Sequence, residues 1–139
     1  MNNFGSLGHS GSKPSPDIDV FPNPGAHNIV FTTHEFHGRC PVTGQPDFYS
    51  LKIAYEPDGL CVETKSLKLY LQWLSGRQMF AEAIAVEISD HLGSAIAAEV
   101  DVQVVQNVRG GIMTEVNATA ANVSQDESIG HHLCPFDGA

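Results

Sequence analysis

The segment EFHGRCPVTGQPDF, residues 35–48, carries the residues best suited to nucleophilic chemistry. Cys40 lies among Gly and Pro residues that predict a fixed, non-helical loop leading into a strand, and functional groups concentrate on such loops. A thiolate is a strong nucleophile near neutral pH, and the adjacent Arg39 would lower the pKa of the thiol. Asp47 follows at the strand entrance, where its side chain can turn back towards Cys40. We predict Cys40 as nucleophile and Asp47 as its proton-handling partner, against the alternatives of an inert buried thiol and ordinary turn chemistry.

The other two cysteines favour structural readings. Cys61 lies within an expected strand, which is typical of a small core residue. Cys134 lies near His131 and His132, but a structural zinc site needs four ligands and no second cluster accompanies these three. We therefore expect no metal site. Three cysteines without a CxxC pair indicate free thiols, as in a cytoplasmic protein.

Basic residues suggest where a phosphate group would bind. ETKSLKLYL, residues 63–71, places Lys65 and Lys68 on one face near an expected helix N-terminus, where free backbone N–H groups also favour phosphate. The sequence has no GxGxxG and no GxxxxGK[ST], which are the usual phosphate-binding motifs for nucleotides. A dinucleotide would therefore need a different phosphate site, such as this pair of lysines. Arg109 in the RGG segment is a further candidate cation. The alternative is a solvated lysine face.

The elements that must position these residues follow from hydrophobic periodicity. Strands are expected at 29–33, 48–55 and 60–63, with EPDG at 56–59 joining the last two as a hairpin. Helices are expected at 66–76 and 78–92, followed by strands at 98–105 and 111–117 with RGG as the turn or bulge between them. This order predicts an α+β fold in which two helices cover one face of an antiparallel sheet.

The expected second helix has a buried stripe of residues spaced by four. Glu82 lies off this stripe, and Gly93 is expected to break the helix. A sheet of four or five strands leaves edges exposed, so we also expect a homo-oligomer. The stripe consists of Phe80, Ile84, Ile88 and Leu92.

Composition limits the organisation and the partners. The chain of 139 residues has room for one domain, which we place at 19–122, because 1–18 and 123–139 have the composition of a disordered tail and a C-terminal tail. The net charge of −9 opposes direct binding of nucleic acid. No apolar run approaches the roughly 20 residues that cross a bilayer, and no signal peptide is visible. We expect a cytoplasmic protein without membrane contact.

Four segments together resemble the 7-cyano-7-deazaguanine reductases of the QueF type, in their short unimodular form. ETKSLKLYL matches the family's Glu-Ser-Lys-Ser-Leu-Lys signature with Thr64 in place of Ser, and CPVTGQPDF matches its nucleophile segment. The resemblance covers most of the expected domain. The segments are FPNP at 21–24, CPVTGQPDF at 40–48, ETKSLKLYL at 63–71 and RGG at 109–111.

The resemblance implies a tunnelling fold, in which subunits close their sheets into a barrel and form active sites between them. It implies an NADPH-dependent oxidoreductase that reduces the nitrile of 7-cyano-7-deazaguanine. The product would be 7-aminomethyl-7-deazaguanine, for the queuosine modification of tRNA. The expected partners are therefore a small deazapurine substrate and further copies of the chain.

The resemblance also implies roles for single residues. Cys40 would form a covalent thioimide with the nitrile carbon, and Asp47 would donate the proton. Glu82 would pair with the guanine-like edge of the base through charge-assisted hydrogen bonds. The family usually has His-Glu where this chain has Ala81 and Glu82, so the substrate position at Ala81 lacks an imidazole. The positions that would hold the deazapurine are Val62, Glu63 and Thr64, and those for NADPH are Lys65, Lys68 and Arg109.

Two alternatives share these residues. One is a related tunnelling-fold amidinotransferase that traps a nitrile without nicotinamide, and the retained Lys65 and Lys68 argue against it. The other is a non-catalytic deazapurine-binding protein, motivated by the change at Ala81. Intact Cys40 and Asp47 argue against that second alternative.

Overall fold

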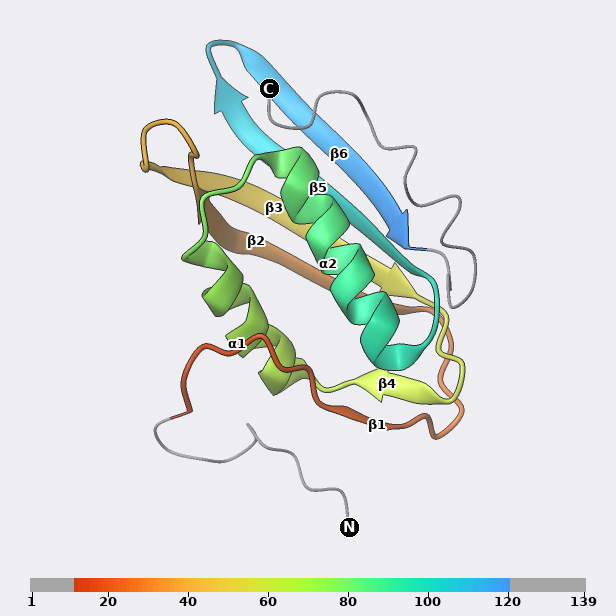
Figure 1. Ribbon diagram of the computed structural model, residues 1–139. Helices are drawn as coiled ribbons and strands as arrows, with labels where there is room; N and C mark the ends of the chain where they lie inside the picture. Colours follow the sequence, from red (N-terminus) through yellow and green to blue (C-terminus); the bar gives the residue numbers. More distant parts are fainter. Residues whose placement is uncertain (1–11, 121–139) are drawn as a thin grey trace, which may run out of the picture.

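The computed structural model describes residues 12–120, which form two helices and two antiparallel sheets. The larger sheet has the strand order β2-β3-β5-β6, and the smaller pairs β1 with β4. Figure 1 shows both helices on one face of the larger sheet. This arrangement confirms the predicted α+β class. The elements are β1 (Val20–Pro22), β2 (Ile29–Arg39), β3 (Pro46–Tyr55), β4 (Leu60–Val62), α1 (Thr64–Ser75), α2 (Ala81–Ile96), β5 (Val100–Arg109) and β6 (Ile112–Ala120).

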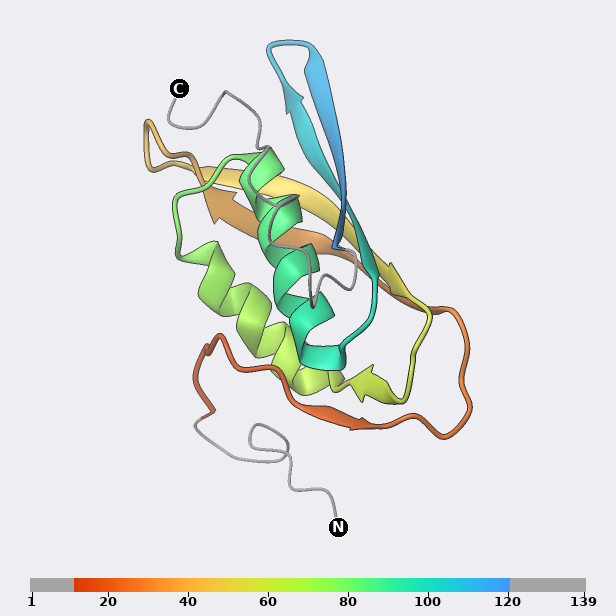
Figure 2. The ribbon, with the colours of Figure 1, turned by 45° about the vertical axis from the view of Figure 1, so that its right-hand side comes forward.

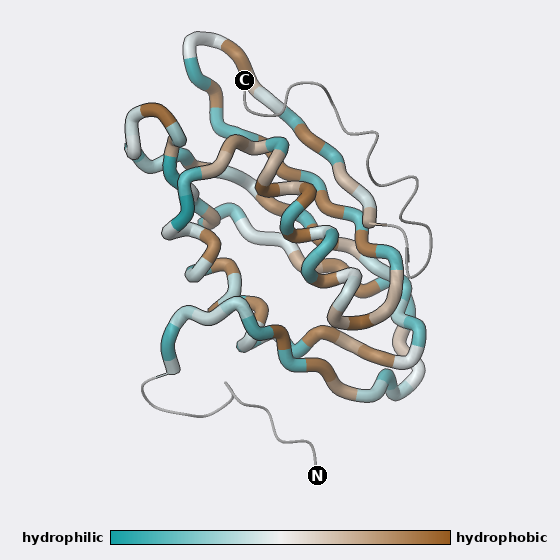
Figure 3. Tube along the Cα trace, viewed as in Figure 1, coloured by the Kyte–Doolittle hydropathy of each residue, from teal (hydrophilic) through white to brown (hydrophobic). Residues whose placement is uncertain are grey.

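The core lies between the larger sheet and the helices. Every second residue of β3 is buried against α2, and residues spaced by about four along α2 meet them. Figure 3 shows the corresponding change between hydrophobic and hydrophilic residues along the strands. Burying each large aliphatic side chain contributes about 1.5–3 kcal/mol. Central core residues are Leu51, Ile53, Ile84, Ile88, Leu92, Val102 and Val104.

The start of α1 is set by Glu63, whose carboxylate accepts hydrogen bonds from the backbone N–H groups of Lys65 (2.6 Å) and Ser66 (2.7 Å). Such a cap satisfies donors that have no partner within the helix. Gly76 follows the last turn and its N–H bonds back to Trp73 at 3.2 Å. The helix therefore begins at Thr64, two residues before the predicted start, and ends where Gly76 predicts.

Helix α2 differs from the prediction at both ends. The predicted break at Gly93 is wrong, because the helix continues to Ile96 and ends at Ala97 in a left-handed conformation (φ 53°). A Cβ at Gly93 would lie 3.1 Å from the carbonyl oxygen of Ala98 and 3.3 Å from Ala120 Cβ, so this glycine permits close packing on the sheet. Phe80 was assigned to the buried stripe, but it precedes the helix and is 52% exposed.

The predicted hairpin between 48–55 and 60–63 is also wrong. Strand β3 pairs with β2 on one side and with β5 on the other, which leaves it no free edge for β4. Strand β4 pairs instead with β1, a strand that was not predicted, in the register Phe21 with Cys61. Alternation along a strand reports which face is buried but not which neighbour occupies the edge.

The long antiparallel pairs carry loops to one end of the molecule. Strand β2 extends six residues beyond the predicted end, to Arg39, through an irregularity between Thr33 and Phe36. Strands β5 and β6 turn at Gly110 and Gly111, which both have positive φ as a tight turn requires. The turned view shows this hairpin projecting past α2, at the end where β2 connects to β3 (Figure 2).

The N-terminal segment contacts both helices where the structure describes it, from residue 12. The N–H of Ser15 donates to the carbonyl of Leu69 at 3.3 Å, and Nε2 of His91 lies 2.5 Å from the carbonyl oxygen of Pro16. Residues 1–11 and 121–139 lie outside the described part, which therefore includes only 12–18 of the predicted N-terminal tail and none of the predicted C-terminal tail at 123–139. Within residues 12–120, neither helix has the length and apolar character needed to span a membrane.

Candidate active site

Cys40 lies in a closed loop between β2 and β3. The N–H of Cys40 donates to the carbonyl of Gln45 at 2.9 Å, and the N–H of Gly44 donates to the carbonyl of Cys40 at 2.8 Å. Gly44 adopts a positive φ of 72°, which a residue with a side chain rarely does. These bonds hold the thiol at the end of the β2–β3 pair, in a fixed loop as the sequence indicates.

The loop also stabilises negative charge on the Cys40 sulfur. The pKa of the thiol is lowered mainly by a hydrogen bond from the Thr43 side chain, and then by the backbone N–H groups of Thr43 and Val42. Burial and the Asp47 carboxylate raise this pKa, but their influence is smaller. Hydrogen bonds to the charged form favour ionisation. The loop itself therefore makes Cys40 a more available thiolate, whereas the sequence predicts this effect from Arg39.

Asp47 lies one residue into β3, with its backbone paired to Gly38 of β2. Its side chain is only 7% exposed, and it forms a short ion pair with the guanidinium of Arg109 at the end of β5. Arg109 is half exposed, so the pair connects a buried carboxylate to the surface. The fold thus places Arg109 beside Asp47, on a different element from Lys65 and Lys68.

Backbone hydrogen bonds hold the start of α2 beside the loop that carries Cys40. The N–H of Met79 donates to the carbonyl of Arg39 at 3.1 Å, and Gln78 forms a backbone bridge with Arg39. Ala81 and Glu82 follow directly, the first buried and the second exposed. The backbone contacts therefore bring the expected base-binding carboxylate to the same end of the sheet as Cys40.

Tyr49 shows that these groups form one cluster. The Tyr49 side chain is buried, and its pKa responds to the charges of four site residues. The four residues are Asp47, Arg109, Cys40 and Glu82. We call these four residues and Tyr49 the catalytic end of the molecule.

The remaining predicted residues lie at the opposite end of α1, which we call the α1 start. Helix α1 has twelve residues and a length of about 18 Å, and it runs from the α1 start towards the catalytic end (Figure 1). Val62 and Glu63 are buried there, while Thr64 and Lys68 are exposed and Lys65 is half-buried. The single chain therefore separates its predicted site residues into two groups.

The capping role of Glu63 corrects one expectation about phosphate binding. The N–H groups of Lys65 and Ser66 are already bonded to the Glu63 carboxylate, so they are not free for a phosphate group. The carbonyl of Glu63 also accepts from the Ser66 hydroxyl at 2.8 Å. Phosphate affinity at this helix start must come from the lysine ammonium groups.

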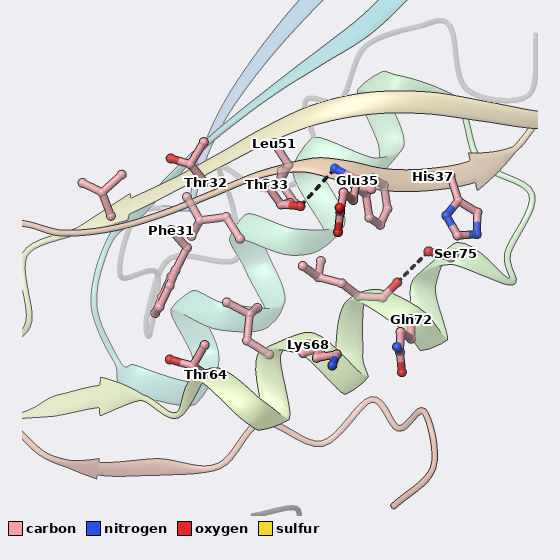
Figure 4. A pocket seen from close by; sticks show the side chains of 15 residues that line it. Phe31, Thr32, Thr33, Glu35, His37, Leu51, Thr64, Lys68, Gln72 and Ser75 are labelled. Carbon is pink, nitrogen blue, oxygen red and sulfur yellow. Dashed lines mark hydrogen bonds between the residues drawn. The ribbon is translucent and has the colours of Figure 1, made fainter.

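A cavity of about 470 Å³ lies between β2 and α1. Figure 4 shows Thr64 and Lys68 on the α1 side and Thr33, Glu35 and His37 on the β2 side. Its inner wall is apolar, which is typical of sites for ring systems. The cavity runs along α1 from Thr64 to Ser75, and Cys40, Asp47 and Glu82 are absent from the described residues that line it. The apolar lining includes Phe31, Leu51, Ile53, Leu67 and Leu71.

Sequence reasoning missed two residues at the catalytic end. Thr43 lies inside the CPVTG loop, and its distance of three residues from the thiol could have suggested a local hydrogen bond. Tyr49 shares the strand face of Asp47 at i+2, a relation visible in the alternation of β3. Among residues 12–120 no group of three or more His, Cys, Asp and Glu side chains could hold a metal ion, and His131, His132 and Cys134 lie outside that range.

Comparisons with known proteins agree with this architecture. Residues 46–125 match the family model described as QueF-like protein. An Anaeromyxobacter protein named NADPH-dependent 7-cyano-7-deazaguanine reductase is 44% identical over 112 residues, covering 77% of this chain and 91% of that protein. A Frankia casuarinae protein of the same name is 39% identical over 115 residues, covering 81% and 92%. These matches confirm the resemblance found in the sequence.

A solved structure shows the fold independently of close sequence similarity. The archaeosine synthase QueF-Like in its apo form superposes with a TM-score of 0.63, covering 69% of this chain and 95% of that one, at 21% identity. At that identity the likeness is informative about fold alone. It confirms the tunnelling fold expected from the sequence.

Proposed function

We propose, because the chain belongs to the QueF-like family, that it is an NADPH-dependent reductase of 7-cyano-7-deazaguanine in queuosine biosynthesis. The observation that carries the proposal is the Cys40 loop, whose hydrogen bonds lower the pKa of a thiol next to the buried Asp47. A nitrile is a weak electrophile, so its reduction benefits from a covalent step at a stabilised thiolate. We assign the activity to residues 19–122.

Cys40 and Asp47 carry the covalent step. The Cys40 sulfur forms a bond to the nitrile carbon while one π bond of the nitrile breaks, which gives a thioimide. Asp47 accepts the thiol proton and delivers it to the nitrogen, so no proton is lost or gained overall. Arg109 positions the Asp47 carboxylate through their ion pair.

The lysines of α1 are suited to hold the cofactor. NADPH would supply one hydride each time it binds, so the conversion of nitrile to amine would consume two NADPH molecules in succession. Lys68 lies in the wall of the 470 Å³ cavity and Lys65 lies one turn earlier, so their ammonium groups can attract phosphates at its rim. The apolar interior between β2 and α1 accommodates a ring. The residues present therefore fit a dinucleotide whose phosphates bind side chains rather than backbone N–H groups.

Substrate recognition combines both ends of the molecule. Exposed Glu82 is free to accept two hydrogen bonds from the guanine-like edge of the base, next to the thiol that attacks its nitrile. Val62, Glu63 and Thr64 are separated from that position by the length of α1. A complete site therefore requires the α1 start of a second copy of the chain.

The sheet edges support assembly of such a homo-oligomer. Strands β2 and β6 are the two edges of the larger sheet, and edge strands present unpaired backbone groups that another sheet can bond. Pairing β2 of one subunit with β6 of the next would extend the sheet towards a closed barrel. We place this enzyme in the cytoplasm, where a thiol nucleophile stays reduced, and we expect no direct nucleic-acid or membrane partner.

Absorbance of NADPH tests the activity. Purified protein mixed with 7-cyano-7-deazaguanine should consume NADPH and yield 7-aminomethyl-7-deazaguanine, whereas Cys40→Ala should not. A covalent adduct without NADPH consumption would indicate the nitrile-trapping alternative. Binding without either would indicate the non-catalytic one.

Subunit mixing tests the shared site. Cys40→Ala and Lys68→Ala alter opposite ends of one chain, so each homo-oligomer should have little activity. After co-refolding, some interfaces would combine an intact catalytic end with an intact α1 start, and activity should return. A mixture that stays as inactive as its components, although native mass spectrometry shows mixed oligomers, would contradict a site built from two subunits.

A further inference from the structure

The Tyr49 ring is held between β2 and the first turn of α2. It lies two residues after Asp47 on the same face of β3, and its ring centroid is 5.7 Å from that of Phe36. A Cβ placed on Gly38 would lie 3.5 Å from both Tyr49 Cε2 and Ile84 Cδ1. The bare backbone of Gly38 therefore lets the ring reach from the sheet towards the start of α2.

The Tyr49 hydroxyl has no hydrogen-bond partner among residues 12–120, although the side chain is 1% exposed. Buried hydroxyl groups are normally hydrogen-bonded, because an unmade bond leaves the cost of removing water uncompensated. Tyr55 on the same strand shows the usual case, since its hydroxyl accepts from the N–H of Val62 at 2.9 Å. The orphaned hydroxyl of Tyr49 indicates a partner outside the described residues.

The charges around Tyr49 indicate which partner that is. Burial raises the pKa of Tyr49 to about 12, and Asp47 adds to the shift while Arg109 opposes it. The hydroxyl thus keeps its proton near neutral pH and can donate it in a hydrogen bond. Cys40 and Glu82, which the proposed function assigns to the nitrile and to the guanine-like edge, also act on this group. Tyr49 also lies two residues after Asp47 on the same face of β3, so its side chain belongs to the catalytic end.

We propose that the Tyr49 hydroxyl donates a hydrogen bond to an acceptor atom of the deazapurine ring, making it a substrate-binding residue of the catalytic end. This inference rests on the proposed function. It explains why a polar group is kept in an apolar setting at this position. Loss of the hydroxyl should weaken the substrate complex and leave the fold intact.

Tyr70 provides a matched control. Its hydroxyl is also buried and unpartnered within the described residues, but it lies on α1, where the ring stacks on His91 at 4.5 Å. The charges that act on its pKa come from Glu87 and Arg77 rather than from the catalytic end. Tyr70→Phe therefore removes the same kind of group at a place where no substrate is expected.

The test compares Tyr49→Phe and Tyr70→Phe in the full chain. Calorimetry measures the affinity for 7-cyano-7-deazaguanine on a Cys40→Ala background that prevents the covalent step, and urea unfolding measures stability. Tyr49→Phe should weaken binding roughly two- to tenfold, as loss of one neutral hydrogen bond does, while its unfolding midpoint stays equal or rises. Tyr70→Phe should leave binding unchanged with an equal or higher midpoint.

Three outcomes would overturn the inference. Unchanged affinity in Tyr49→Phe would show that the hydroxyl does not meet the substrate. A lower unfolding midpoint in Tyr49→Phe would show that the hydroxyl has a partner within the protein. Equal loss of affinity in Tyr70→Phe would show an indirect effect. If the parent protein binds and reduces the nitrile, these outcomes remove only the role of Tyr49; if it does neither, the proposed function fails with it.

Discussion

Cys40 and Cys61 are both buried free thiols, yet they lie in contrasting regions of the molecule. Cys40 lies in a loop that directs a hydroxyl and two backbone N–H groups at its sulfur. Cys61 lies in β4, and its sulfur contacts the side-chain oxygen of Asn23 at 3.5 Å. That oxygen is an acceptor, so the contact uses the thiol hydrogen. The groups around a buried cysteine therefore distinguish a nucleophile from a packing residue better than exposure does.

The backbone explains the contrast. Strand β4 pairs with β1, and the N–H of Val62 donates to the Tyr55 hydroxyl, so these backbone groups do not serve the Cys61 sulfur. The loop after β2 leaves the N–H groups of Val42 and Thr43 without a strand partner and turns them towards Cys40. The same residue type thus acquires different chemistry from local backbone geometry.

The largest expected effect is on the thiols themselves. Cys40→Ala should abolish the covalent adduct with 7-cyano-7-deazaguanine and lower turnover by roughly 10³-fold or more, because the covalent route is lost. Cys61→Ala should retain both. Intact-mass spectrometry without NADPH decides the comparison. An adduct that persists in Cys40→Ala would place the nucleophile elsewhere.

The second-largest expected effect concerns proton transfer by Asp47. Asp47→Asn removes the carboxylate that moves it, so turnover should fall by about 10²–10⁴-fold, as for loss of general acid–base catalysis. Asp58→Asn, in the exposed loop before β4, serves as the control and should match the parent protein. Steady-state NADPH oxidation measures both. Near-normal turnover in Asp47→Asn would remove Asp47 from the mechanism.

A smaller effect tests the source of the thiol pKa. Thr43→Val removes the largest influence that lowers the Cys40 pKa, so this pKa should rise and the thiolate fraction at neutral pH should fall. The pH profile of iodoacetamide alkylation should therefore move to higher pH, whereas Thr43→Ser should keep the profile of the parent protein. A background that carries both Cys61→Ala and Cys134→Ala leaves Cys40 as the one cysteine that can react. A profile that does not move in Thr43→Val would mean that the backbone N–H groups alone stabilise the thiolate.

The smallest expected effect concerns Cys61. Cys61→Ala should lower the free energy of unfolding by about 1 kcal/mol, because a small buried side chain and one weak contact are lost. Urea unfolding of this variant beside the parent protein measures the difference. A change in turnover at equal stability would show that Cys61 has a role in the reaction.

Much of the local structure followed from the sequence alone. The CPVTGQPDF segment indicated a rigid loop with Cys40 and Asp47 at its two ends, and the period of about 3.6 residues located both helices. The RGG segment predicted the turn that Gly110 and Gly111 make. These features depend on neighbours within a few residues, which sequence patterns report directly.

Tertiary structure decided which distant residues meet. Arg109 pairs with Asp47 across 62 residues, β4 joins β1 rather than β3, and the Glu63 carboxylate occupies N–H groups that were expected to be free. In each case several groups could have bound the same partner. That partner is a carboxylate in the first case, a strand edge in the second and a helix N-terminus in the third. Hydrophobic periodicity is the same whichever competitor wins, so it shows which face of an element is buried and leaves its partners to be settled by the fold.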